Sequence, residues 1–308
     1  MNSLSGQGAL PSQLIVVDGS TDSTTRELVE GWGANVASEC EVIWQRANHV
    51  GAAIQRNQGV EAASQPFVWF FDDDILFETE CVKRLWGAIE NSNEICGVSA
   101  MITNQRYSAP GRVTRTLYRL LDGKDRRSYA GRCIGPAFNI LPEDDSSLAE
   151  VVPVDWLNTT CTIYRREAMP RPPFESHFTG YSFMEDLALS LTVGKKWKLA
   201  NARTARIYHD SQPADYKKNR AAIAQMELVN RHYIMTSILG RRHVIDYAKL
   251  ALLEGFCVAT PLVSGREWLS LPPVLLGKAT AAVSIICNGS RRATAPGIIE
   301  ERKSFESS

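Results

Sequence analysis

The stretch LIVVDGSTDSTTRELVE, residues 14–30, joins a short apolar run to an amphipathic run through a polar turn. Its first four residues are branched and apolar and lead into Asp18, which is typical of a buried strand that ends in a loop. A hydroxyl or carboxylate of the turn can cap the following helix, and we expect that helix to end at Gly31 or Gly33. A strand–turn–helix unit of this kind predicts an α/β protein.

The same alternation continues along the chain to residue 102. We expect further strands at 41–44, 66–72 and 94–102, and helices at 51–63 and 78–92. Strands and helices that alternate at short intervals predict an α/β layer fold, with a largely parallel sheet and helices on both of its faces.

A basic segment, residues 103–132, interrupts this rhythm. It contains eight basic residues: Arg106, Arg112, Arg115, Arg119, Lys124, Arg126, Arg127 and Arg132. Such a segment suits a lipid diphosphate or an anionic membrane surface. A mobile, solvated loop explains the same composition, so both interpretations stay open.

Apolar segments then resume and lead into a helical region. VVPVDWL, CTIY, WKLA and ARIYH are typical of strands, and FMEDLALSLTVGKK predicts a helix. From Lys217 onward the pattern is helical and closes in a polar tail. We therefore expect a first domain at 1–215 and a helical, membrane-associated or core-packed region at 216–308.

The composition excludes several classes of protein. The 34 basic and 34 acidic residues cancel, which gives no support for nucleic-acid binding. The seven cysteines include no CxxC pair, so neither a zinc site nor a redox motif is indicated, and a reducing cytosol is expected. The apolar stretch at 268–288 is broken by Pro272, Pro273 and Lys278, so we do not expect it to cross a bilayer. A place in a membrane interface and packing on the core both stay open for it. The expected location is the cytoplasm, with peripheral contact at the inner face of the membrane.

A candidate metal site lies in VWFFDDDILF, residues 68–77. Alternate side chains leave a strand on opposite faces, so Asp72 and Asp74 can point the same way, with Asp73 directed away. Two carboxylates suit Mg²⁺ or Mn²⁺ that bridges a diphosphate. The alternative is a solvated turn that caps a helix starting at Glu78, and the stretch by itself favours neither.

Glu185 and Asp186 form a second acidic site among aromatic and apolar neighbours. Such surroundings raise the pKa of a carboxyl group toward the range of a general base. Ordinary acidic residues at a helix start are the alternative. The turn at Asp18–Ser20 can likewise contact a nucleotide or only cap its helix.

Taken together, these motifs resemble the inverting glycosyltransferases of family 2, which have the GT-A fold, and in particular rhamnosyltransferase-like bacterial members. Four stretches carry the resemblance in the family's order: LIVVDGSTDSTTRELVE, QRNQGVEAA, FVWFFDDDI, and VDWLNTTCTIYRREAM followed by FTGYSFMEDLALSL. They cover about residues 5–210. The resemblance implies a sugar transfer from a nucleotide sugar to a glycan or a polyprenyl-diphosphate-linked acceptor in cell-envelope polysaccharide biosynthesis.

The resemblance also implies roles for single residues. Asp18, Ser20, Arg56, Asn57 and Asp72 would bind the nucleotide. Asp72, Asp74 and His209 would hold Mg²⁺ or Mn²⁺. Asp186 would deprotonate the acceptor, Glu185 would orient it, and Asp155 and Trp156 would line the sugar and acceptor pocket.

The chain departs from the family's pattern at several points. The family's first strand, which ends in a proline-threonine turn, is not seen, so we expect either a start further upstream or an inactive copy that serves as a binding or scaffold protein. Thr192 and Ala188 stand where an arginine and an acidic residue are usual. A nucleotidyltransferase is a further alternative, but the glycine-rich, basic phosphate loop expected of that class is not visible.

Overall fold

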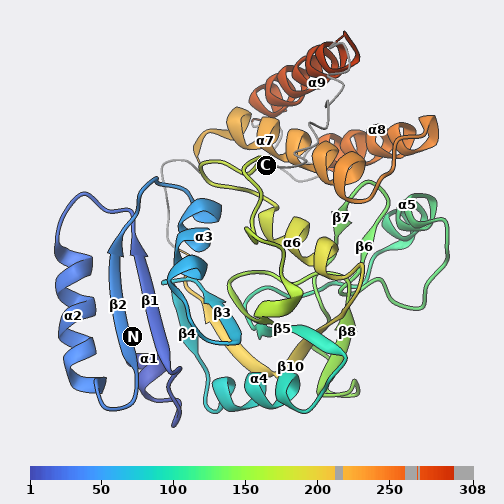
Figure 1. The fold of residues 1–308 in the computed structure, drawn as a ribbon. Coiled ribbons are helices and arrows are strands. Elements are labelled where there is room, and N and C mark those ends of the chain that lie inside the picture. Colours follow the sequence, from blue (N-terminus) through green and yellow to red (C-terminus); the bar gives the residue numbers. More distant parts are fainter. Residues whose placement is uncertain (212–217, 261–268, 270, 295–308) are drawn as a thin grey trace, which may run out of the picture.

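The computed structural model describes residues 1–211, 218–260, 269 and 271–294 (Figure 1). Up to residue 102 its elements are α1 (Asn2–Ser5), β1 (Gln13–Asp18), α2 (Thr24–Val36), β2 (Glu41–Arg46), α3 (Ala52–Ala62), β3 (Phe67–Phe71), β4 (Ile75–Phe77), α4 (Cys81–Glu90) and β5 (Ile95–Ile102). The predicted order of strands and helices in this half is confirmed. The short strand β4 was not predicted.

The predicted end of α2 is wrong. The helix passes through Gly31 and Gly33 and continues to Val36. A Cβ atom at Gly33 would lie 3.1 Å from Cβ of Val42 on β2. Gly33 therefore allows the helix to approach the neighbouring strand closely and does not stop it.

The second half adds strands and helices around the same sheet. They are α5 (Arg112–Asp122), β6 (Cys133–Ile134), β7 (Phe138–Asn139), β8 (Val151–Val154), β9 (Cys161–Arg165), the 3₁₀ turn Arg166–Ala168, α6 (Glu185–Val193) and β10 (Lys198–His209). The two strands expected in WKLA and ARIYH form the single strand β10, which carries an irregularity between Ala202 and Arg206.

The strands form a central six-stranded sheet and two small pairs. The central sheet has the order β3-β9-β5-β10-β4, and β8 pairs with β10. β5 and β10 run parallel, and β3 has the same direction because both β3 and β5 are antiparallel to β9. β1 and β2 form a separate parallel pair, and no ladder of the described residues joins β1 to β3.

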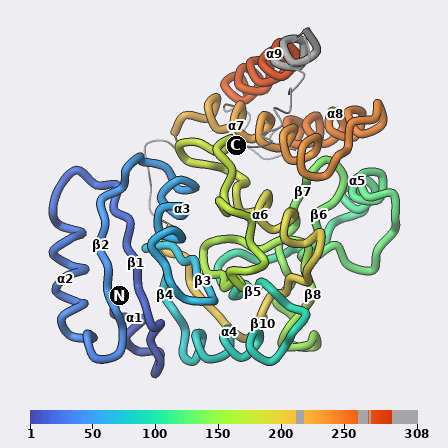
Figure 2. The backbone as a smooth tube through the Cα atoms, in the orientation of Figure 1, coloured from blue at the N-terminus to red at the C-terminus, as the bar shows by residue number. Residues whose placement is uncertain are grey.

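Apolar side chains cover both faces of the central sheet. On one face, Leu85 and Ile89 of α4 pack among buried residues of β5, β9 and β10. On the other face, Leu187 and Leu189 of α6 pack with Trp156. Figure 2 shows α4 and α6 on opposite sides of these strands. The predicted class, α/β with helices on both faces of the sheet, is confirmed.

Three helices form the C-terminal part: α7 (Arg220–Tyr233), α8 (Val244–Ala259) and α9 (Leu271–Thr294), with a π-helical turn at Ile234–Ile238. They lie together beyond α6 (Figure 1). None of the helices that the structure describes has the length and apolar content needed to cross a bilayer. The start of the apolar stretch at 268–288 and the polar tail from 295 lie outside the described residues.

Candidate active site

The three aspartates lie in a turn between β3 and β4. Asp72 and Asp74 each offer a carboxylate oxygen, and His209 at the end of β10 offers a ring nitrogen; these ligand atoms lie within 4.8 Å of one another. His209 reaches this place because β10 pairs antiparallel with β4, so that His209 lies opposite Ile75. Since β3 ends at Phe71, the turn rather than the alternation of a strand brings the two aspartates together.

Two contacts fix the imidazole of His209. Its Nε2 atom lies 3.1 Å from Oδ1 of Asp74, and its Nδ1 atom lies 3.3 Å from the side-chain nitrogen of Gln105. The contact with Gln105 was not expected from the sequence. The alternative in which the aspartates cap a helix at Glu78 is wrong, because β4 follows the turn and α4 begins only at Cys81.

Arg56 connects this turn to the Glu-Asp pair. Its Nη2 atom donates to Oδ1 of Asp72 at 2.8 Å, and its Nη1 atom donates to Oε1 of Glu185 at 2.6 Å. The guanidinium also lies over the ring of Phe174, 5.9 Å from the ring centre. The pKa of Arg56 is raised: burial lowers it, but the charges of Asp72 and Glu185 outweigh that effect. A fully ionised arginine therefore joins the aspartate turn to the Glu-Asp pair, although the two motifs lie far apart in the sequence.

The loop before α6 fixes the position of the Glu-Asp pair. Ser182 and Met184 have left-handed backbone conformations, with φ of 58° and 74°. Such backbone conformations are unfavourable for residues other than glycine, and they persist only where the surrounding structure imposes them. The start of α3 does so here, because the amide of Ala52 donates to the carbonyl of Gly180 and the amide of Ala53 donates to Oγ of Ser182. α3 thus positions both Arg56 and the acids that follow the loop.

The two acids of α6 have raised pKa values. Burial raises the pKa of Asp186 to about 6, against the hydrogen bond that its Oδ1 accepts from the amide of Leu187. Burial and the charge of Asp186 raise the pKa of Glu185, while Arg56 opposes the shift. Two carboxylates, on Asp72 and Glu185, thus pair with one guanidinium, and Asp186 adds a third acidic group beside them.

Asp18 is the last residue of β1, directly before the turn. Asp18 is buried, accepts hydrogen bonds from the amide of Ser20 and from Nε1 of Trp44, and pairs with Arg46 at 3.4 Å. Burial raises its pKa, but these bonds and the charge of Arg46 outweigh burial and leave the pKa below its usual value. The N-cap residue of α2 is Ser23, which makes no side-chain cap bond, although Asp22 accepts from the amide of Thr24, the first residue of the helix. A role for Asp18 and Ser20 in nucleotide binding stays a prediction.

Three further residues make structural contacts. Asn57 exchanges two hydrogen bonds with the backbone of Phe174. Asp155 accepts from Arg132 at 3.0 Å and from the amide of Cys133. Trp156 is 7% exposed and donates its indole N–H to the carbonyl of Ile140. The structure places Trp156 in the core, so the assignment of Asp155 and Trp156 to a sugar or acceptor pocket stays a prediction, as does that of Asn57 to the nucleotide.

A cavity of about 400 Å³ opens beside Glu185, on the face of α6 directed toward the loop at 170–176. Its wall includes Arg171, Glu175, Ala188 and Thr192. Ala188 and Thr192 are the two positions of α6 at which this chain departs from the family's pattern. Their small side chains leave the space open next to the Glu-Asp pair.

Part of the chain is similar to a known protein family. The family described as "Glycosyl transferase family 2" matches residues 1–141. This match covers less than half of the 308-residue chain. No match was found among curated proteins.

The fold is also found in solved glycosyltransferase structures. A mannosyltransferase from Pyrobaculum calidifontis, in complex with GDP-mannose and Mn²⁺, matches with a TM-score of 0.52 and 14% identity over 96% of this chain and 75% of its own. Glucosyl-3-phosphoglycerate synthase from Mycobacterium tuberculosis matches with a TM-score of 0.44 and 17% identity over 79% of this chain and 74% of its own. The predicted GT-A fold is confirmed, and residues 1–141 match a glycosyltransferase family.

Proposed function

We propose that this glycosyltransferase is a metal-dependent, inverting enzyme. It transfers a sugar from a nucleotide sugar to a glycan or lipid-linked acceptor in cell-envelope polysaccharide biosynthesis, and it acts in the cytoplasm. The observation that carries the proposal is the double ion pair of Arg56 with Asp72 and Glu185. This pair makes the aspartate turn and the Glu-Asp motif parts of a single site.

The residues of the aspartate turn fit a divalent cation. Carboxylate oxygens suit Mg²⁺ and Mn²⁺, which usually take one or two protein carboxylates and leave their other positions to phosphates and water. Asp72, Asp74 and His209 would hold the ion, because their donor atoms already lie together. When bound, the ion would stabilise the charge of the departing nucleoside diphosphate.

The acids of α6 supply the proton chemistry. A carboxyl group with a pKa of about 6, as in Asp186, is largely ionised at neutral pH and is still basic enough to accept the proton of an acceptor hydroxyl. Glu185 is held by Arg56 and orients the acceptor or the base. The acceptor oxygen then attacks the anomeric carbon from the side opposite the nucleotide, which inverts that carbon.

The cavity beside Glu185 supports a place for the acceptor. Its wall includes Glu185, which precedes the proposed base in the chain, and the polar side chains of Arg171 and Ser176 beside three prolines. Such groups can bond hydroxyls or a phosphate of an acceptor.

The proposal is tested by titration calorimetry with a panel of nucleoside diphosphates, with and without Mn²⁺. We expect at least one of them to bind only when the metal is present. If none binds in a metal-dependent way, the catalytic proposal is wrong, and a binding or scaffold role takes its place. A hydrolysis or transfer assay with the sugar nucleotide of the bound diphosphate then tests the reaction itself.

A further inference from the structure

The helix α8 buries Leu250 and Leu253, and the side chains that it exposes are also apolar. Its exposed positions are Val244, Ile245, Tyr247, Ala248, Ala251, Leu252, Gly255 and Ala259. They recur at helical spacing and include no charged residue, and Val244 is 87% exposed. A helix on the surface of a soluble protein normally shows the opposite pattern.

The helix α9 repeats this pattern. Among the residues of α9 whose side chains are described, the exposed ones are Pro272, Leu275, Leu276, Ala279, Thr280, Ala282, Val283, Ile286 and Cys287. Again none is charged, and Leu276 is 65% exposed. Together these residues of α8 and α9 form what we term the apolar face.

One charged residue of each helix is paired beneath this face. Lys278 of α9 donates to Glu227 at 2.7 Å and to Glu254 of α8 at 2.6 Å. Arg231 of α7 pairs with the same two acids. The network joins α7, α8 and α9, which also share a buried apolar cluster of Leu228, Leu250 and Ala281. The outward direction of the apolar residues is therefore built into the packing.

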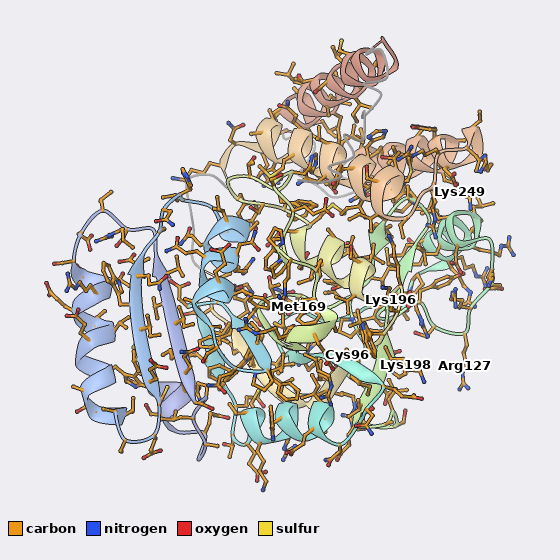
Figure 3. The ribbon with its side chains drawn as sticks, viewed as in Figure 1. Cys96, Arg127, Met169, Lys196, Lys198 and Lys249 are labelled. Atoms are coloured by element: carbon orange, nitrogen blue, oxygen red, sulfur yellow. The ribbon has the colours of Figure 1, made fainter. Side chains whose placement is uncertain are left out.

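A basic helix lies beside α8. Leu121 of α5 is in one buried cluster with Leu253 of α8, and Lys249 donates to the carbonyl of Leu121 at 2.8 Å. Figure 3 shows Lys249 where α8 meets α5. The exposed cations of α5 and its following loop are Arg112, Arg119, Lys124 and Arg127. The neighbouring cations Arg115 and Arg126 are paired with Asp125 and Asp122.

We propose that the apolar face and these four cations form a docking surface for an anionic lipid bilayer. The side chains of the apolar face would enter the interfacial region, and the cations of α5 would contact lipid phosphates. The sequence alone allowed two interpretations of the basic segment, a lipid site or a mobile loop. The structure shows that part of this segment is the helix α5, and the proposal gives its cations a role. The inference does not depend on the proposed transfer reaction.

Charge complementarity favours lipid over a second copy of the chain. The described residues of the apolar face expose no carboxylate that a second copy could offer to Arg112 or Arg119. A contact between two copies through the apolar face alone would leave the four cations of α5 and its following loop without an anionic partner. An anionic bilayer satisfies both components at once.

The test is co-sedimentation of the full chain with vesicles of phosphatidylglycerol and phosphatidylcholine, and with vesicles of phosphatidylcholine alone. We expect binding to the anionic vesicles that weakens at high salt. Replacing both Arg112→Ser and Arg119→Ser should weaken it roughly 25-fold, about fivefold for each charge. Ile245→Glu with Leu276→Glu should weaken it by at least about tenfold.

A matched control comes from the far side of the molecule. Leu28 on α2 is 65% exposed, as Leu276 is, but lies outside the docking surface. Leu28→Glu should leave vesicle binding unchanged. Because all the substituted side chains are exposed, circular dichroism and thermal unfolding should show every variant folded.

A native cysteine gives a direct readout of insertion. Of the seven cysteines, all of which the structure describes, Cys287 alone is exposed, and it belongs to the apolar face. A polarity-sensitive fluorophore on Cys287 should shift to the blue when anionic vesicles are added, and a Cys287→Ser protein should give no such signal.

Two results would overturn the inference. One is a folded protein that fails to bind anionic vesicles at low salt. The other is a dimer in analytical ultracentrifugation that Ile245→Glu with Leu276→Glu converts to a monomer while vesicle binding is absent, since the apolar face would then be an interface between copies.

Discussion

Arg56 on α3 and Glu185 at the start of α6 form a 2.6 Å ion pair although they stand 129 positions apart in the chain. The same guanidinium binds Asp72. The pair is largely buried, so the positive charge serves two carboxylates that water screens only weakly. Removing one partner of such a pair leaves the other charges buried without compensation.

Arg56→Gln should therefore lower the free energy of unfolding by about 3 kcal/mol. It should also abolish metal-dependent nucleotide binding, because Asp72 loses the group that fixes it. Urea denaturation measures the first effect and calorimetry the second. The matched control is Arg26→Gln, whose exposed pair with Glu30 is screened by water, so that its loss should leave the free energy of unfolding nearly unchanged. Equal effects of the two substitutions would refute the special role of Arg56.

Asp74→Asn should remove the dependence of nucleotide binding on Mn²⁺, because it takes one carboxylate from the three ligands that lie together. The neighbouring Asp73 is not among those ligands, so Asp73→Asn provides the control. We expect Asp73→Asn to keep the metal response within about threefold, a small change against the loss of a first ligand. Titration of each variant with Mn²⁺ at a fixed nucleotide concentration separates the two cases.

Asp186→Asn should keep nucleotide and metal binding but lower the transfer rate by roughly 10² to 10⁴, the usual contribution of a general base. Since the base must be ionised, kcat/KM of the unmodified enzyme should rise with pH up to about 6 and level off above that value. The measurement is a pH profile of initial rates. If kcat/KM of Asp186→Asn still falls as the pH drops below about 6, another group is the base.

The same substitution should stabilise the protein at neutral pH. The pKa of Asp186 is raised from 3.8 to about 6 on folding, so ionised Asp186 opposes the folded state above pH 6. The asparagine side chain would keep an acceptor for the amide of Leu187 without that charge. In the absence of metal, we expect the free energy of unfolding of Asp186→Asn to exceed that of the original protein by roughly 1–2 kcal/mol at pH 7.

This difference should shrink as the pH falls below 6 and vanish below the unfolded pKa, where the carboxyl is protonated in both states. Denaturant unfolding at several pH values gives the comparison. A gain that is independent of pH would mean that the carboxylate charge is not its cause.

Thr192→Arg should fill the cavity beside Glu185, because Thr192 forms part of its wall. If the acceptor binds there, KM for the acceptor should rise by about tenfold or more, while the affinity for the nucleotide stays the same. Thr192→Ser, which keeps the hydroxyl and adds no volume, is the control. An unchanged KM in the arginine variant would place the acceptor elsewhere.

Local patterns predicted much of the fold. The branched runs before Asp18 and in β3 and β5 gave strands in the expected order, because a buried strand needs little beyond its own residues to be identified. Helix α5 was not predicted, since its charged residues obscure Leu117 and Leu121, the two that it buries. The length of α2 depended on a contact between Gly33 and Val42 that no local pattern records.

The candidate site was predictable in its parts but not in its connections. The aspartate turn and His209 lie together as the resemblance implied. The ion pairs of Arg56 with Asp72 and Glu185 could not be predicted from the sequence, although Arg56 is the only basic residue of α3. Trp156 likewise bonds the backbone of Ile140, in a segment without a recognisable pattern. Contacts between distant segments decide such roles.

The separation of β1 from β3 has a consequence for the behaviour of the protein in solution. The carbonyls of Ser12 and Asp18 accept bonds from amides on the β2 side, so the peptide groups of Ile15 and Val17 point the other way. The side-chain amide of Gln55 donates to the carbonyl of Val17, a bond that a neighbouring strand would otherwise make.

On β3, the bonds to β9 at Pro66 and Asp72 likewise leave the peptide groups of Phe67, Trp69 and Phe71 directed away from β9. An extended segment from any source can add to such an edge, and natural proteins usually protect these edges because strand addition leads to aggregation. A protein concentration that suits crystallisation should therefore also promote association through strands β1 and β3, and peptides that pair with them should suppress it.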